Sequence, residues 1–376
     1  MRLAIVALLG AISSACALAG PPSPQAPDPA IVPMPAIVDH SGVGPMIDRA
    51  LMPRAATGFA ERRVRGVWRN RSTGADCRQG DDNCAMARAF ETVPSNLGAF
   101  RVTCSFAKMA YDDPIVFPGQ PGVSHLHTFT GNVGVDAFST VESIAGSGNS
   151  TCSGGTLNRS SYWFPTMIDT ANGKPLVPTT NVVYYKGSYE FDISKTVRAL
   201  PAGLRMVSGN AKNTDPNTVG ARYVCIGPKR ENPGWKSTIT AAYADGTCKV
   251  GGDFIMEVGF PFCWDGVNLD SPNHAAHIRG AEQDRTPPFA KHCPATHPVT
   301  LPVISYNIHY LITDDQAVGR WRLSSDMDPS LPAGISGHGD YFLGWDKETM
   351  QTWIDGCLRA KKDCHADLLG NKTTLY

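Results

Sequence analysis

The sequence has 376 residues, enough for two or three domains of average size or for one large β-sandwich or barrel. Hydrophobic residues make up 42% and charged residues only 18%, and together with 37 glycines and 29 prolines this excludes a coiled coil or a helical bundle. The 34 basic and 34 acidic residues balance, which argues against binding to nucleic acid or to an anionic membrane surface.

Residues 1–19 have the pattern of a secretory signal peptide. Arg2 precedes the apolar run Leu3 to Leu9, and the small-residue pattern Ala17-Leu18-Ala19 predicts cleavage after residue 19. The alternative is a lipoprotein anchor at Cys16, which we rank second because Ser13 stands where such a signal has an aliphatic residue. Later stretches all fall short of the about 18 apolar residues of a membrane span. We therefore expect a secreted or periplasmic protein without a transmembrane segment.

The sequence contains eleven cysteines, and ten remain once the signal peptide with Cys16 is removed. An even number of cysteines in an exported chain indicates disulfides. The mature sequence contains no C-x-x-C pair, which disfavours zinc binding by cysteines. Each of the three longer loops would contribute roughly 3 to 4 kcal/mol if closed by a disulfide. The grouping along the chain suggests the pairs Cys77–Cys84, Cys104–Cys152, Cys225–Cys248, Cys263–Cys293 and Cys357–Cys364.

The mature chain divides into three parts. Residues 20–45 are dense in proline and predict a flexible, disordered tether. Residues 46–99 contain a short helix around residues 45–48 and the loop from Cys77 to Cys84, and we interpret them as a lead-in segment. Residues 100–376 form a single β-rich domain, either catalytic or binding.

Short apolar runs in this domain alternate with Gly, Pro and Asn, and Val, Ile, Tyr and Phe recur at every second position. The runs are FRVTCSF, NVVYYKGSYEF, GLRMVSG, ARYVCIG, DFIMEVGF and PVISYNIHYLI. No helical pattern long enough for a βαβ unit separates them, so they predict an antiparallel β-sandwich or jelly roll with long loops and few short helices. One C-terminal helix is expected after the cap Asp346, with Met350, Trp353 and Cys357 on its apolar face.

The segment around residues 118–132 contains the first candidate site residues. His125 and His127 are two residues apart, so on a strand both imidazoles point to the same face and could bind one metal ion or one substrate. Asn132 follows as a candidate substrate-binding residue. The structural alternative is a pair of surface histidines beside a turn.

A second candidate segment spans residues 261–277. Ser271-Pro272 predicts the start of a short helix, which would place His274 and His277 on one face as metal ligands or proton-transfer groups. Asp265 and Asp270 are candidate bases or orienting groups. The alternative assigns both aspartates to turn and cap hydrogen bonds.

Three further segments complete the set. His338 lies between two glycines, and Asp340 could orient an imidazole or bind a cation. Ser324-Ser325-Asp326 precedes them, and His297 lies in another polar segment. Trp163 is a candidate for stacking on a sugar ring, with a core strand as the alternative. Trp264 is a second candidate for contact with substrate.

The order of these motifs resembles the family called domain of unknown function 1996. The resemblance covers about residues 100–345. It implies secreted fungal and bacterial proteins, some of the fungal ones fused to WSC modules that are associated with cell-wall carbohydrate. It assigns no activity. The motifs are His125-Leu126-His127, Tyr162-Trp163-Phe164-Pro165, Cys263-Trp264-Asp265-Gly266, Leu269-Asp270-Ser271-Pro272 with His274 and His277, Cys293-Pro294 with His297-Pro298, and His338-Gly339-Asp340.

Two hypotheses follow. In the first, the protein is an enzyme of the hydrolase or lyase type that acts on polysaccharide or another envelope polymer, with histidine and aspartate as acid, base or ligands of a divalent metal. In the second, it is a non-catalytic cell-wall or metal-binding protein that uses the same cleft. The absence of Gly-x-Ser-x-Gly disfavours a serine hydrolase, and the absence of His-Glu-x-x-His disfavours a zincin protease.

Overall fold

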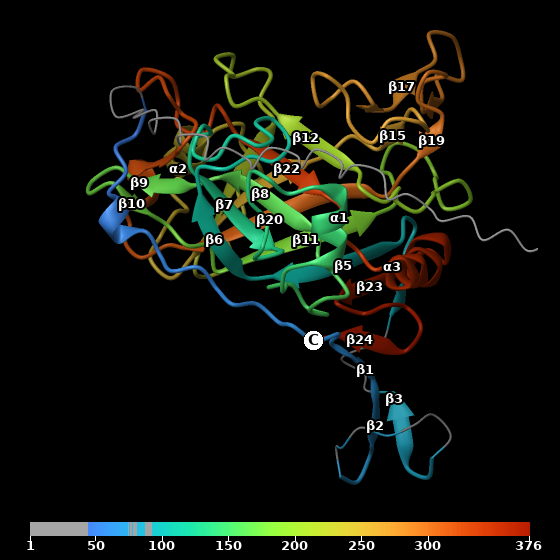
Figure 1. Cartoon of the computed structure of the whole chain (residues 1–376). Coiled ribbons are helices and arrows are strands. Elements are labelled where there is room, and N and C mark those ends of the chain that lie inside the picture. The colour runs from blue at the N-terminus through green and yellow to red at the C-terminus, as the bar shows by residue number, and fades with distance from the viewer. Residues whose placement is uncertain (1–43, 74, 76, 78–80, 87–91) are drawn as a thin grey trace, which may run out of the picture. The chain divides into compact units, whose positions relative to one another are not determined.

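The structure is a computed structural model that describes residues 44–376 except residues 74, 76, 78–80 and 87–91. The expected signal peptide and nearly all of the expected tether lie outside the described residues. Two large β-sheets pack against each other and enclose most of the hydrophobic core (Figure 1). The prediction of a mainly β, antiparallel fold with few short helices and one C-terminal helix is confirmed.

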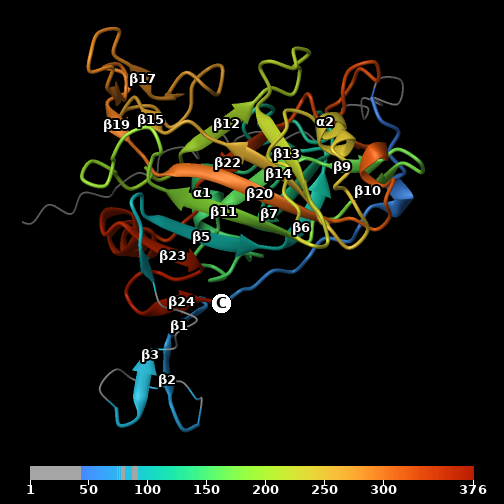
Figure 2. The same cartoon turned by 180° about the vertical axis from the view of Figure 1, so that it is seen from behind.

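The larger sheet has seven strands in the order β13-β14-β20-β11-β5-β23-β4, and its outer face is turned toward the viewer in Figure 2. Neighbouring strands are antiparallel except β23 and β5, which are parallel. Buried and partly exposed residues alternate along β5 and β11, as the sequence predicts for strands with one face in the core. The strands span, in sheet order, Ala221–Ile226, Asp253–Gly259, Val303–Leu311, Thr180–Lys186, Ala99–Cys104, Lys362–Ala366 and Val93–Pro94.

The smaller sheet has five antiparallel strands in the order β12-β22-β8-β7-β6. Residues of β7, β8 and β22 are buried on both faces of the sheet. Tyr162 points into the main core, whereas its neighbour Trp163 belongs to a second apolar cluster on the opposite face, with Phe129, Phe342 and Ile144. The strands span, in sheet order, Arg205–Gly209, His338–Phe342, Ser161–Pro165, His127–Gly131 and Phe106–Ala110.

Side chains from the two sheets meet in the main core. Tyr162 of β8 packs edge-on against Tyr306 of β20, with ring centroids 5.6 Å apart. The Tyr306 hydroxyl donates a hydrogen bond of 2.7 Å to the backbone oxygen of Asp340 in β22. The Asn181 amide of β11 donates to the hydroxyl of Thr130 in β7 at 3.0 Å. The fold is therefore a β-sandwich in which aromatic packing and hydrogen bonds of buried polar groups connect the two layers.

Helices are few and short. The C-terminal helix consists of α3 (Lys347–Trp353) and its continuation η4 (Ile354–Arg359), and the Asp346 side chain accepts a hydrogen bond from the backbone N–H of Thr349, which confirms the predicted helix and cap. The helix predicted from Ser271 is wrong: residues 271–277 form turns, and His274 has a φ of 56°, which a right-handed helix cannot include. The other helices are η1 (Arg49–Leu51), α1 (Val141–Gly146), α2 (Ile239–Ala244) and η3 (Val318–Arg320).

Short strands join peripheral segments to this body. β1 pairs with β24 near the C-terminus and β4 forms one edge of the larger sheet, so the expected lead-in segment at residues 46–99 is hydrogen-bonded to the β-rich domain. The remaining strands of the described residues are β1 (Val64–Gly66), β2 (Trp68–Asn70), β3 (Cys84–Met86), β9 (Met167–Asp169), β10 (Lys174–Pro175), β15 (Cys263–Trp264), β16 (Ile278–Arg279), β17 (Glu282–Gln283), β18 (Lys291–His292), β19 (Val299–Thr300), β21 (Trp321–Leu323) and β24 (Thr373–Leu375).

All five predicted disulfides are present. Cys104–Cys152 joins β5 to the segment after α1, and Cys263–Cys293 joins β15 to the segment before β19. The other three are Cys77–Cys84, Cys225–Cys248 and Cys357–Cys364. Within the described residues, no helix combines the length and the hydrophobicity needed to cross a membrane.

Candidate metal centre

Two histidines meet at the start of β7. His127 is the first residue of this strand and is fully buried, while His125 lies two residues earlier and is partly exposed. Their ring centroids are 4.2 Å apart. The His127 Nδ1 lies 3.0 Å from the backbone oxygen of Asp112, and because a carbonyl oxygen can only accept, Nδ1 carries the proton. The lone pair of this imidazole is therefore on Nε2, which is buried and has no hydrogen-bond partner among the described residues.

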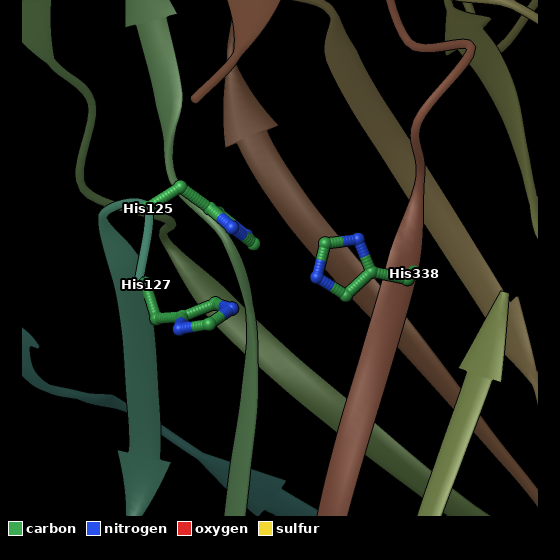
Figure 3. A group of neighbouring side chains, drawn as sticks. All are labelled: His125, His127 and His338. Atoms are coloured by element: carbon green, nitrogen blue, oxygen red, sulfur yellow. The ribbon is translucent and has the colours of Figure 1, made fainter. Parts of the chain in front are cut away.

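A third histidine reaches the same point from β22. His338 is the first residue of that strand, and its ring centroid lies 5.0 Å from that of His125 and 5.8 Å from that of His127. Its Nδ1 donates to the backbone oxygen of Ser336 at 2.8 Å, so its lone pair is also on Nε2. The three rings point toward one another (Figure 3), and one ligand nitrogen from each lies within 4.8 Å of the other two.

The register of the smaller sheet explains why these side chains meet. β7 and β22 lie on either side of β8 and are both antiparallel to it, so they run in the same direction. His127 is opposite Pro165 of β8, and Asp340 is opposite Trp163, two residues earlier on the same strand. His127 and His338 therefore begin two strands that run in the same direction, one on each side of β8, at the same end of the sheet. Asp340 shares the face of His338 because residues two apart on a strand point the same way.

Two buried carboxyl groups complete the cluster. Asp113, Asp340 and His127 each have a potential ligand atom within 4.8 Å of the other two. Asp113 lies in the segment after β6, where its Oδ1 accepts hydrogen bonds of 2.9 Å from the backbone N–H groups of Ile115 and Val116. Asp340 Oδ2 is buried and has no hydrogen-bond partner in the described part of the chain. We call His125, His127, His338, Asp113 and Asp340 the five-residue centre.

Burial sets the protonation states of the centre. It lowers the pKa of His127 to about 4, and burial together with the nearby His127 lowers that of His338 to about 4, so both imidazoles are neutral at pH 7. Burial raises the pKa of Asp113, against the lowering effect of its backbone hydrogen bonds and of His338 and His274. Burial and the neighbouring Asp113 raise the pKa of Asp340 well above its usual value.

These groups fit a divalent metal ion. Neutral imidazoles with an available Nε2 lone pair, each fixed by a hydrogen bond from Nδ1 to a backbone carbonyl, have the arrangement of metal-binding histidines in proteins. Two carboxylates forced together in a dry site repel each other unless a cation or protons neutralise them. Imidazole suits zinc, copper, iron and nickel, whereas carboxylate suits manganese and magnesium, so the mixed set suits a first-row transition metal.

An outer layer of hydrogen bonds orients His338. Asp326 is buried, and its two carboxylate oxygens accept from the backbone N–H groups of Leu323, Gly334 and Ser336 and from the Ser336 hydroxyl. Ser336 in turn provides the carbonyl that binds His338 Nδ1. The polar segment at residues 324–326, which sequence reasoning singled out, thus fixes the loop that carries His338.

Ser324 helps to position the other two histidines, His125 and His127. Its hydroxyl donates to the backbone oxygen of Leu126 at 2.5 Å and accepts from the backbone N–H of Thr166 at 3.0 Å. Leu126 lies between His125 and His127. This bond therefore ties the histidine-containing segment to the end of β8.

The second predicted segment has a different arrangement. His277 uses both ring nitrogens, Nε2 with the backbone oxygen of Arg205 at 2.7 Å and Nδ1 with the Ser271 hydroxyl at 3.1 Å. His274 Nδ1 is 3.0 Å from the carboxylate of Asp270, which also contacts Arg205 at 3.4 Å. Among the described residues, neither His274 nor His277 joins a group of potential metal ligands. That they share a metal site with His125 and His127 therefore stays a prediction. His274 does act electrostatically on Asp113, whose pKa it lowers slightly against the effect of burial.

Four other candidates have structural contacts. Asp265 accepts hydrogen bonds from the backbone N–H groups of Val267 and Asn268, which is the turn role considered as the alternative. Trp264 donates from Nε1 to the backbone oxygen of Asn268 at 2.6 Å. Asn132 is buried and binds three backbone groups, and Trp163 is fully buried in the second apolar cluster. These positions fit core and turn residues better than a surface for substrate, and a direct role in binding or catalysis stays a prediction.

Sequence reasoning missed Asp113. The residue stands in Tyr-Asp-Asp-Pro at the end of a strand, a sequence that reads as an ordinary turn, and Asp113 does form turn hydrogen bonds with its first oxygen. The one signal in its favour is proximity in the sequence to His125 and His127.

Comparison with known proteins gives the family. The chain matches the family described as "Domain of unknown function (DUF1996)" over residues 113–345, more than half of its length, and it belongs to that family. The matched segment begins at Asp113 and includes all five residues of the centre. No curated protein and no solved structure matches the chain.

Proposed function

We propose that this protein binds one divalent first-row transition metal at the five-residue centre. The observation that supports this proposal is a pair of overlapping groups of potential ligands that share the buried His127, namely three imidazoles in one group and His127 with two buried carboxyl groups in the other, with the His127 and His338 lone pairs on Nε2. A cation there would neutralise the two carboxylates and occupy the buried atoms of His127 and Asp340 that have no partner among the described residues.

The five disulfides indicate an oxidising, extracellular compartment, because such bonds form and persist in exported proteins. We propose that the protein is secreted or periplasmic, in agreement with the signal-peptide pattern of residues 1–19. Metal would then be acquired outside the cytosol.

Elemental analysis of the purified mature protein tests metal binding. We expect about one equivalent of a transition metal per chain, and loss of that metal in His127→Ala. His292→Ala is the matched control, since His292 lies in β18 beside Glu282 and Asp284 and is far more exposed. Metal-free wild-type protein that also fails to bind added zinc, manganese or iron(II) would contradict the proposal.

A second candidate function is a metal-dependent hydrolase or lyase that acts on polysaccharide or another envelope polymer. The specific observation in its favour is that His125 is partly exposed, whereas the other four residues of the centre are buried, so the centre lies near the protein surface on the side of His125. A metal ion there would polarise a substrate oxygen or lower the pKa of a bound water. Burial raises the pKa values of Asp113 and Asp340, so a carboxyl of this pair that does not bind the metal would be a candidate proton-transfer group.

A screen for reducing ends and unsaturated products on a glycan panel tests this activity. We expect product release by the metal-loaded protein and none by the metal-free protein or by His127→Ala. Metal binding without product release from any glycan would leave the non-catalytic metal-binding protein as the function.

A further inference from the structure

A groove with a volume of about 460 Å³ lies beside the ends of β13 and β14, and no residue of the five-residue centre lines it. Its size is within the range of small-ligand sites, which is about 300–1,000 Å³. Trp235, Arg222, Lys236 and Glu257 line it together with backbone at Gly220 and Gly259. The groove thus combines one large aromatic ring with several hydrogen-bonding groups.

Trp235 is 36% exposed, and the groups next to it are well ordered by contacts with β13. The next residue, Lys236, exchanges backbone hydrogen bonds of 2.7 and 2.8 Å with Tyr223 of β13. The Arg222 guanidinium lies 4.8 Å from the centroid of the indole ring, in cation–π geometry. These contacts restrict the backbone beside Trp235 and one face of its ring, which reduces the entropy lost when a ligand binds.

The charged groups of the groove are paired within the protein. Arg222 forms an ion pair with Glu257, and Lys236 forms one of 2.9 Å with Asp245. The Glu257 side chain is almost entirely buried. Because each cation has its own carboxylate, the groove has no unpaired charge that would select an anionic or a cationic ligand. Its hydrogen-bonding capacity is intact, since carboxylates have several lone pairs and guanidinium has five donors.

We propose that this groove binds the sugar rings of a neutral glycan, with Trp235 packed against the apolar face of one ring. A pyranose has a face of C–H groups and a rim of hydroxyls, which match an exposed indole beside paired charged groups. The proposal extends the second candidate function, because it assigns a polysaccharide-binding site and a neutral substrate class. It does not depend on metal binding.

The groove lies close to the backbone that carries His338. Gly209 of β12 is opposite His338, and a Cβ at Gly209 would come within 2.8 Å of the His338 Cα. A Cβ at Gly220, in the wall of the groove, would lie 2.1 Å from the Gly209 Cα and 2.8 Å from the Gly337 oxygen. The backbones of three glycines therefore pack together between the groove and the centre. A glycan chain bound at Trp235 would be anchored one strand away from the residues that hold the metal.

Calorimetric titration with defined hexasaccharides tests the proposal. The neutral probes are cellohexaose, laminarihexaose, chitohexaose and mannohexaose, and the acidic probe is hexagalacturonate. We expect saturable binding of at least one neutral probe with quenching of tryptophan fluorescence. Trp235→Ala should weaken that binding at least about tenfold, whereas Trp235→Tyr should retain most of it because an aromatic ring remains.

Phe138→Ala is the matched control, since Phe138 is an exposed aromatic residue, 63% accessible, that does not line the groove. The affinity of the Phe138→Ala variant for the neutral probe should equal that of the wild type. Metal content should be unchanged in Trp235→Ala, and glycan binding should persist after chelation, so that failure of this proposal is distinct from failure of the metal site. Absence of neutral binding, preference for the acidic probe, or equal loss in Phe138→Ala would overturn the proposal.

Discussion

Two histidine-containing segments of this protein have the same kind of sequence pattern and different local chemistry. His125 and His127 are joined by His338 at the end of the smaller sheet, where the Nδ1 atoms of His127 and His338 bind backbone carbonyls and their Nε2 atoms face inward. His274 and His277 lie in turns, and both ring nitrogens of His277 are used by neighbouring groups. The first segment keeps its metal-binding atoms available, and the second uses its histidines to hold a loop.

The difference lies in what surrounds each pair. A strand start places an imidazole against carbonyl groups of an adjacent loop, which bind one nitrogen and leave the other directed across the sheet. The turn that contains His277 offers a hydroxyl and a carbonyl on two sides of the ring, so both nitrogens of His277 have a partner. Spacing along the chain therefore identifies paired histidines, while the partners of each nitrogen decide whether they can bind a metal.

The largest effect should come from removing an inward-facing ligand. We expect His338→Ala to lower metal affinity by more than the about 10- to 100-fold that loss of an outer partner costs, because a ligand itself is lost. His274→Ala should leave affinity unchanged. Titration of the metal-free variants with zinc measures both. An equal loss of zinc affinity in the two variants would contradict the conclusion that only the first segment binds metal.

A smaller effect on metal affinity is expected from Asp326, which does not belong to the centre but orients the loop that carries His338. Asp326→Asn keeps the size of the side chain but weakens four hydrogen bonds that fix the Ser336 loop. Because that loop orients His338, metal affinity should fall by about 10- to 100-fold while the fold is retained. Asp270→Asn, which changes the carboxylate beside His274, is the control. The same titration measures the two variants, and an unchanged affinity in Asp326→Asn would contradict the orienting role.

The pH dependence of metal binding should come from the carboxyl groups. Burial raises the pKa values of Asp113 and Asp340, so in the metal-free centre they keep their protons to a higher pH than ordinary aspartates do, and a metal must displace the protons they hold. Affinity should therefore fall as the pH is lowered. His127 and His338 have pKa values of about 4 and should add nothing above that pH.

Calorimetry in buffers of different ionisation enthalpy measures the protons released. Asp340→Asn should release about one proton fewer than the wild type, because it lacks one of the two acids. Release that is unchanged in this variant would assign the protons to other groups.

The smallest effect on metal is expected at His277. His277→Ala removes hydrogen bonds to the Arg205 carbonyl and the Ser271 hydroxyl, and we expect it to lower the free energy of unfolding by about 1–3 kcal/mol. Metal content should equal that of the wild type. Denaturant unfolding and elemental analysis measure the two quantities. A loss of metal with unchanged stability would show that His277 belongs to the centre.

Much of the fold could be predicted from the sequence, because the patterns that specify it are local. Apolar and polar residues alternate along much of β20, β11 is rich in Val and Tyr, and the cap at Asp346 lies directly before the helix it begins. The disulfides followed from cysteines that pair with near neighbours in the chain. The helix predicted at Ser271 failed because side-chain hydrogen bonds of Ser271 and Asn273 stabilise turns there.

The centre could be predicted only in part. The spacing of His125 and His127 identifies them as candidates. His338 and Asp340 are identified by their place in a glycine-containing segment. What joins them is the pairing of β7 and β22 with the same strand β8, a register that no local pattern specifies. Asp113 was missed because its turn hydrogen bonds fully account for its place in the sequence.

The ligands of the centre come from near both ends of the family segment, from Asp113 to Asp340. The chain between them must close its longest loops before the five groups can meet, so the centre cannot exist in a partly folded chain. Bound metal would therefore report that β22 had docked beside β8.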